Sequence, residues 1–232
     1  METRALTSIL YSLGYDPKPF LPRIIQIGDK TACRLDKDSK KLVRANYERA
    51  SLLHGLVTHY GLRSFLEFGT GRGFSCGCLA DFGNLGNIVT VDYRASKPVK
   101  KLLRQCGVNS DRIQFLTKNS KDLVQSDVTN KFDLVLIDAQ HDGEAVDRDL
   151  AFALSVLDKR GIIVFDDYNE EFHSVQQSIL RAVAEGLFDQ AVMVMTDGWL
   201  IDERIVGDEK PYRQREINTG MVVAAIGYKI PD

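Results

Sequence analysis

The sequence predicts an α/β domain built on a mostly parallel β-sheet with helices on both faces. Short apolar runs alternate with helical patterns beyond residue 60, which is the order that parallel strands and their crossover helices produce. A glycine-rich segment joins the first run to the helix after it, and acidic residues follow later runs. In such a sheet the carboxyl ends of the strands share one edge, so these residues predict a ligand site there.

The individual elements follow from the periodicity of apolar residues. A helical stripe spans residues 42–60 and ends before Gly61, a natural helix terminator. The predicted strands are residues 65–68, 88–91, 113–116, 132–137, 162–165, 191–195 and 221–226. The later predicted helices are residues 75–82, 98–106, 145–157 and 175–184. Residues 1–40 are irregular in pattern, and we interpret them as an N-terminal extension that packs on the domain of residues 41–232.

Composition and charge exclude several classes of protein. With 232 residues and 44% hydrophobic content, the chain is neither disordered nor fibrous. Its formal charge of -2 gives no global field for nucleic acid or an anionic membrane, so we expect neither as a partner. No apolar run approaches the ~18 residues of a membrane helix, and the N-terminus does not resemble a signal peptide. We therefore expect a cytoplasmic protein.

The first 22 positions contain apolar residues that bear on the oligomeric state. These residues are Ile9, Leu10, Phe20 and Leu21. They could cover their own domain as easily as a neighbouring subunit, so a homo-oligomer is one expectation.

The strongest local signal is the segment Glu67-Phe68-Gly69-Thr70-Gly71-Arg72-Gly73, which lies between a predicted strand and a predicted helix. Glycines let the backbone turn tightly and let a ligand approach N–H groups at a helix N-terminus. Asp92 ends the next predicted strand, where a carboxylate can accept hydrogen bonds from ribose hydroxyls. Together these features predict an adenosine site. A dinucleotide fingerprint would need a third glycine where the chain has Phe74, which disfavours a nicotinamide cofactor.

Acidic residues follow the fourth and fifth strands of the predicted parallel sheet. Asp138 follows one of them, and the pair Asp166-Asp167 follows the other. Three clustered carboxylates raise one another's pKa unless a cation neutralises them, and oxygen ligands suit Mg²⁺. The sequence therefore predicts a metal site at these three residues. His141, with an ordinary pKa near ~6.5, is the candidate general base, and the alternative is a histidine at a helix start bonded to a nearby carboxylate.

Together these motifs resemble the class I S-adenosylmethionine-dependent methyltransferases. The form E-x-G-x-G-x-G at residues 67–73 is similar to their motif I. Residues 132–138, His141 and the acids at 166–167 are similar to a family that includes macrolide-sugar O-methyltransferases and cephalosporin-hydroxylase-like proteins, of the methyltransferase family 24 type. The resemblance covers about residues 60–228. It implies a Rossmann-like, seven-stranded, mostly parallel sheet whose last strand is antiparallel.

The resemblance also implies residue roles. Asp138, Asp166 and Asp167 hold a divalent metal in that family, and the residue matching His141 acts as the general base. The residues expected to bind S-adenosylmethionine are Glu67, Gly69, Thr70, Gly71, Gly73, Ser75, Asp92, Asn119, Ser120 and Asp138. Residues 1–40 and the loop at residues 201–219 match no motif, and such regions typically close over the substrate.

The expected function is methyl transfer from S-adenosylmethionine, assisted by Mg²⁺, to a hydroxyl of a small molecule. A sugar or a phenolic natural product is the expected acceptor. Three alternatives stay open on the sequence alone. They are metal-independent transfer to nitrogen or carbon, a noncatalytic domain that binds S-adenosylmethionine, and a nicotinamide oxidoreductase.

Overall fold

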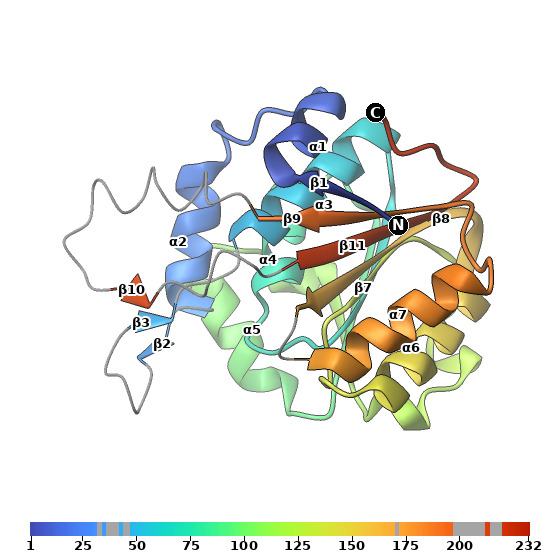
Figure 1. Cartoon of the computed structure of the whole chain (residues 1–232). Coiled ribbons are helices and arrows are strands. Elements are labelled where there is room, and N and C mark those ends of the chain that lie inside the picture. Colours follow the sequence, from blue (N-terminus) through green and yellow to red (C-terminus); the bar gives the residue numbers. More distant parts are fainter. Residues whose placement is uncertain (32–33, 36–41, 44–46, 170–171, 197–211, 214–219) are drawn as a thin grey trace.

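The centre of the molecule is a sheet of eight strands in the order β1-β9-β11-β8-β7-β4-β5-β6 (Figure 1). The computed structural model describes residues 1–31, 34–35, 42–43, 47–169, 172–196, 212–213 and 220–232. The strands are β1 (Glu2–Ala5), β4 (Ser64–Phe68), β5 (Asn87–Asp92), β6 (Ile113–Thr117), β7 (Phe132–Ile137), β8 (Leu157–Tyr168), β9 (Gln190–Met195) and β11 (Gly220–Ile226). Strand β11 runs antiparallel to both neighbours, and the other pairs are parallel. The predicted α/β fold and its antiparallel last strand are therefore confirmed.

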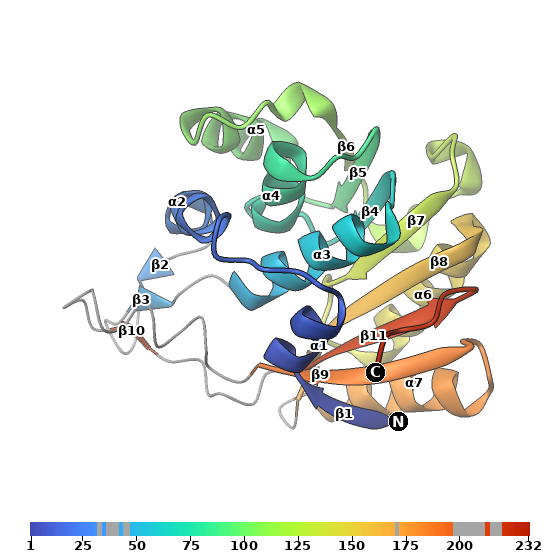
Figure 2. The same ribbon diagram turned by 90° about the horizontal axis from the view of Figure 1, so that it is seen from above.

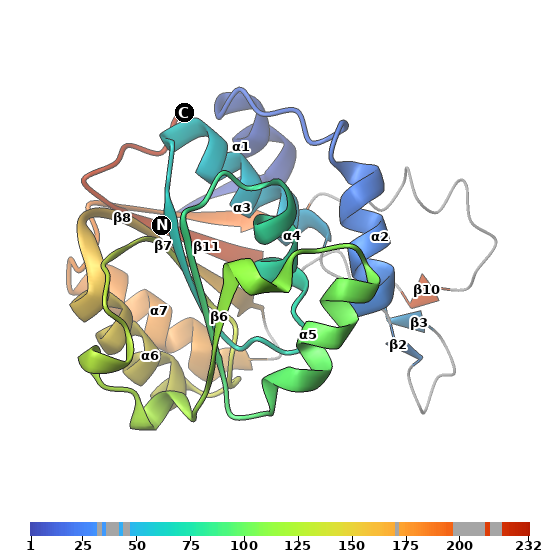
Figure 3. The same cartoon turned by 180° about the vertical axis from the view of Figure 1, so that it is seen from behind.

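Helices cover both faces of the sheet, and each face has its own apolar core (Figures 2 and 3). One face carries α1 (Leu6–Ser12), α2 (Leu21–Thr31), α3 (Tyr47–Tyr60), α4 (Phe74–Phe82) and α5 (Ser96–Gln105). The other face carries α6 (Gly143–Val156) and α7 (His173–Ala184). Strand periodicity divides the side chains between the cores: Leu134 and Leu136 belong to the first, Val135 and Ile137 to the second.

Short elements complete the described part of the chain. Three 3₁₀ turns are η1 (Ser110–Arg112), η2 (Ser120–Asp122) and η3 (Gln125–Asp127). A small sheet beside α2 contains β2 (Arg34–Leu35), β3 (Leu42–Val43) and β10 (Tyr212–Arg213), as Figures 1 and 3 show. The helix predicted from residue 42 therefore begins at Tyr47. Apart from β10, the predicted loop at residues 201–219 lies outside the described residues.

The N-terminal segment contributes to the main sheet, which has eight strands where seven were expected. Strand β1 pairs in parallel with β9, so that Glu2 lies opposite Val192 and Ala5 opposite Met195. The sequence pattern missed this strand because it is short, lies at the edge of the sheet and contains no apolar run. The early apolar residues Ile9 and Leu10 are buried in the core of their own domain.

The order of the parallel strands determines where a ligand site can form. Strands β5 and β6 extend the sheet on one side of β4, whereas β7 and β8 lie on the other side. The direction in which successive strands are added to the sheet therefore reverses between β4 and β7. Open α/β sheets bind ligands at the carboxyl ends of the strands at such a point. Gly69 follows β4 and Asp138 follows β7. Among the described helices, none has the length and apolarity that a membrane crossing requires.

Candidate functional site

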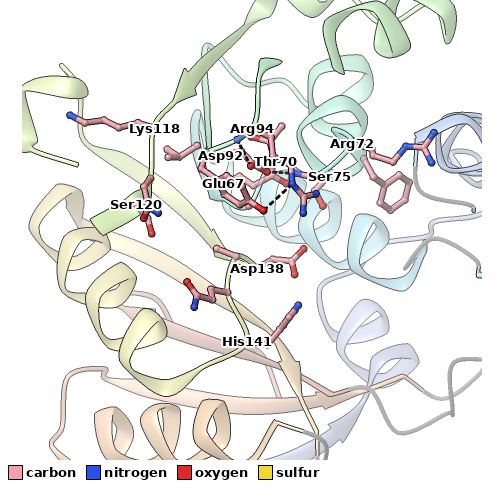
Figure 4. Close-up of a pocket in the computed structure, with 18 of the residues that line it drawn as sticks. Glu67, Thr70, Arg72, Ser75, Asp92, Arg94, Lys118, Ser120, Asp138 and His141 are labelled. Atoms are coloured by element: carbon pink, nitrogen blue, oxygen red, sulfur yellow. Dashed lines mark hydrogen bonds between the residues drawn. The ribbon is translucent and has the colours of Figure 1, made fainter. Parts of the chain in front are cut away.

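A cavity of about 750 Å³ opens at this edge of the sheet (Figure 4). Its volume lies in the range of ~300–1,000 Å³ that small-molecule sites occupy. The predicted cofactor residues that line it are Glu67, Gly69, Thr70, Gly71, Ser75, Asp92, Asn119, Ser120 and Asp138. His141 lines it as well. Gly73 is the one predicted cofactor residue outside the lining, and it forms the N-cap of α4.

The glycine-rich turn after β4 brings the ends of β4 and β7 together. Gly69 has a φ of 93°, and a Cβ atom there would lie 1.9 Å from the carbonyl oxygen of Asp138. Only glycine fits a backbone that is both left-handed and this close to another main chain. The amide of Asp138 in turn donates a hydrogen bond of 3.0 Å to the carbonyl of Phe68. The turn therefore determines where the Asp138 backbone lies.

Asp92 connects the glycine-rich turn to the next strand. Its carboxylate accepts hydrogen bonds from the backbone N–H groups of Gly71 and Arg94, each at 2.9 Å. Because backbone groups hold both oxygens, the carboxylate is preorganised where β5 ends. Carboxylate oxygens have further lone pairs, which suits them to accept from ribose hydroxyls.

Glu67 is a buried carboxyl group in the cavity wall. Its side chain accepts a hydrogen bond of 2.6 Å from Thr90 Oγ1, and Thr90 is 2.7 Å from Thr70 Oγ1. Burial raises the pKa of Glu67 to about 7, while the hydrogen bond from Thr90 and the charge of Arg49 oppose this shift. Glu67 can therefore offer a ligand either a proton donor or an acceptor close to neutral pH.

The segment after β6 lines the opposite part of the cavity, where adenine is expected. The side-chain oxygen of Asn119 accepts a hydrogen bond of 3.1 Å from the backbone N–H of Lys121 and so caps η2. That oxygen is therefore engaged within the turn. The oxygen keeps a second lone pair, so the adenine contact predicted at this segment stays assigned to the Asn119 amide or to Ser120.

The three predicted metal-ligating residues are close together. Oxygen atoms of Asp138, Asp166 and Asp167 all lie within 4.8 Å of one another. Asp167 has a φ of 58°, the one positive value among non-glycine residues in the described ranges. Strained backbone of this kind collects at functional sites. Burial raises the pKa of the Asp138 carboxyl, the charge of Arg49 opposes this shift, and the charges of Asp166 and Asp167 add to it.

The cluster also contains an arginine that the sequence analysis did not single out. Arg49 of α3 hydrogen-bonds through Nη1 to Asp138 Oδ2 at 2.5 Å and to Asp166 Oδ2. Its side chain is 12% exposed. Burial alone would lower the pKa of Arg49, but Asp138 and Asp166 outweigh that effect and raise it. Arg49 is therefore a fixed cation within this group of carboxylates.

The sequence did contain a signal for Arg49. Leu52, Leu53 and Leu56 lie three, four and seven positions after it, and all three are fully buried. A charged residue at this spacing lies on the apolar stripe of a helix, and a charge there requires a partner. The apolar periodicity of residues 42–60 predicts the helix and assigns no role to Arg49.

His141 forms an oriented pair with Asp167. Its Nδ1 lies 2.9 Å from Asp167 Oδ2, and its ring stacks on Phe172 with centroids 4.6 Å apart. The hydrogen bond to Asp167 raises the pKa of His141, partly opposed by burial. Because Nδ1 faces the carboxylate, Nε2 is the ring nitrogen that can exchange a proton with a ligand. The predicted base thus has an orienting partner that the sequence had assigned to metal binding.

Comparisons with known proteins agree with this geometry. Residues 66–168, somewhat less than half of the chain, match the family model described as a methyltransferase domain. No curated protein matches the chain. An O-methyltransferase from Bacillus cereus in complex with S-adenosylhomocysteine is 18% identical, with a TM-score of 0.59 and 90% of each chain covered. TomG, an O-methyltransferase from Streptomyces achromogenes involved in tomaymycin synthesis, solved with S-adenosylmethionine, is 18% identical, with a TM-score of 0.59 and 89% of each chain covered. Residues 66–168 are therefore similar to a methyltransferase domain, and the chain has the fold of these O-methyltransferases.

Proposed function

We propose that this chain, whose residues 66–168 are similar to a methyltransferase domain, transfers the methyl group of S-adenosylmethionine to a hydroxyl of a small molecule. The observation that carries the proposal is one continuous cavity. The glycine-rich turn and Asp92, which suit an adenosine, line one part of this cavity. Asp138 and His141, which can accept the proton of a hydroxyl, line another part of it. That both similar structures are named O-methyltransferases supports oxygen as the acceptor atom.

The pair of His141 and Asp167 supplies the proton chemistry of the proposed reaction. Methyl transfer is an in-line displacement in which a carbon–oxygen bond forms, the carbon–sulfur bond breaks and S-adenosylhomocysteine leaves. The hydroxyl proton passes to Nε2 of His141, while Asp167, 2.9 Å from Nδ1, orients the ring and stabilises its charged form. Holding the hydroxyl near the methyl carbon supplies much of the acceleration.

Magnesium dependence is a separate part of the prediction. Three carboxylates within 4.8 Å are the donor type that Mg²⁺ prefers. However, the guanidinium of Arg49 bonds two of them, Asp138 and Asp166, so this arrangement does not accommodate a divalent ion unless Arg49 moves away. No step of the proposed reaction therefore involves a metal, and the Mg²⁺ requirement stays a prediction that activity with and without EDTA tests.

Calorimetric titration with S-adenosylhomocysteine tests the cofactor part of the proposal. The wild type should bind it, and Asp92→Ala should weaken binding at least about tenfold, because hydrogen bonds to a charged group contribute about 1.5–3 kcal/mol. Asp111→Ala is the matched control, because Asp111 is an exposed carboxylate paired with Arg104. Tighter binding of NADH than of S-adenosylhomocysteine would instead revive the nicotinamide oxidoreductase.

A panel of acceptors tests the transfer itself. We expect S-adenosylhomocysteine to form with a sugar or phenolic hydroxyl and the product to be methylated on oxygen. Methylation on nitrogen or carbon would correct the acceptor class. Cofactor binding without product from any acceptor would favour a noncatalytic domain.

A further inference from the structure

Among the described residues, Arg49 is the one arginine or lysine lining the cavity that bonds the acidic cluster. Lys118 bonds Asp127 at 2.7 Å, Arg72 bonds the carbonyl of Lys30 at 3.2 Å, and Arg94 lies over the ring of Tyr93. Their hydrogen bonds and ring contact thus direct these three side chains to other partners. Arg49 instead joins residues that follow β7 to residues at the end of β8.

The packing of α3 holds Arg49 at this position. Its neighbours on the helix, Tyr47 and Ala50, are each 1% exposed, and Leu53 is fully buried. The main chain of Arg49 is therefore part of the apolar core, and its side chain enters the cluster from a rigid element. Because its side chain extends from a rigid, buried helix, Arg49 differs from a surface arginine that contacts a carboxylate by chance.

We propose that Arg49 is the resident cation of the Asp138/Asp166/Asp167 cluster and that its guanidinium and a divalent metal ion exclude each other there. The inference rests on the proposed function for its catalytic meaning, but it concerns cation binding and not turnover. A divalent ion would share the carboxylates of Asp138 and Asp166 with Arg49, which bonds one oxygen of each, and it would meet a positive charge in direct contact with its ligands. The chain itself thus supplies a cation to the cluster, and acceptor deprotonation depends on His141 and Asp167.

Binding of Mn²⁺ tests this inference, because Mn²⁺ takes the same oxygen ligands as Mg²⁺ and its free ion is measured directly by electron paramagnetic resonance. Arg49→Met removes the charge and keeps an unbranched apolar side chain. We expect Arg49→Met to bind Mn²⁺ at least about tenfold more tightly than the wild type. Arg181→Met is the matched control, because Arg181 bonds Asp147 on the surface, and its Mn²⁺ affinity should equal that of the wild type.

Arg49→Lys tests whether the positive charge at this position, and not the packing of the arginine side chain, excludes the metal ion. It keeps a cation on the same helix position, so it should exclude Mn²⁺ as the wild type does. A variant with lysine that bound Mn²⁺ as tightly as Arg49→Met would overturn the inference, since the charge would not be what excludes the ion. Equal affinity in wild type and Arg49→Met, or no binding in either, would also overturn it.

Folding of the variant is itself informative. Arg49→Met leaves Asp138 and Asp166 without the cation that bonds them, so Mn²⁺ should raise its thermal midpoint and leave that of the wild type unchanged. A variant that folds only with Mn²⁺ would support the inference. If Arg49→Met folds under neither condition, Arg49→Gln, which keeps a donor toward the carboxylates, decides by the same affinity criterion. These readouts need no cofactor or acceptor, so failure of the methyl transfer and failure of this inference are distinguishable.

Discussion

Replacing Gly69 by alanine should uncouple the cofactor turn from Asp138. The added Cβ would lie 1.9 Å from the Asp138 carbonyl oxygen and 2.9 Å from Cα of Ala139, so both main chains must move. A left-handed backbone costs a residue with a Cβ about 1–2 kcal/mol. Overpacking a close contact costs about 1–3 kcal/mol more. The free energy of unfolding should therefore fall by about 2–5 kcal/mol, and the binding of S-adenosylhomocysteine should be lost because the cavity wall shifts.

Gly71→Ala is the matched control in the same turn. Gly71 also has a positive φ, 52°, but a Cβ there would meet no atom within 4 Å. It should therefore incur only the backbone cost of about 1–2 kcal/mol. Urea unfolding gives both free energies, and calorimetry gives both affinities. Equal losses in the two variants would refute the reasoning, since they would show that the approach of Gly69 to Asp138 is not what requires glycine.

Two further predictions concern histidines. His141→Gln should lower kcat about 10²- to 10⁴-fold while the affinity for S-adenosylhomocysteine stays unchanged, with the exposed His173→Gln as control; an equal loss of cofactor affinity would contradict a role as base. Burial lowers the pKa of His54 to about 4 from an unfolded value of about 6.5. Its contribution to stability is thus complete above pH about 6.5 and is lost as the pH falls through about 4, by up to about 3 kcal/mol. Urea unfolding of wild type and His54→Phe across this range checks the difference, and identical pH slopes would contradict it.

The cofactor half of the site could be predicted because its residues follow strand ends. Gly69 and Asp138 each come directly after a buried strand and Asp92 ends one, and parallel topology brings such positions to one edge. The place of such a residue in the sequence, at the end of an apolar run, is therefore enough to predict its place in the fold. The strands themselves were predictable for the same reason, since their apolar runs are long enough to stand out.

Features that depend on a single long-range contact were not predictable in this way. Strand β1 has no apolar run, and its pairing with β9 joins residues far apart in the chain. The hydrogen bond between His141 and Asp167 joins residues far apart in the chain, and the sequence does not specify the left-handed backbone of Asp167. The sequence assigns Asp167 to the metal, whereas in the structure its carboxylate also bonds His141, the candidate base.

Arg49 lies in a different part of the chain from the other residues of the candidate site. The carboxylates, the base and the glycine-rich turn all lie within residues 66–168, the segment that matches the methyltransferase domain. The cation that bonds Asp138 and Asp166 lies before that segment, on α3. Because one positive charge determines whether three carboxylates can take a divalent ion, a domain match alone does not specify metal dependence in this chain. The residue at position 49 has to be considered together with the acids that it contacts.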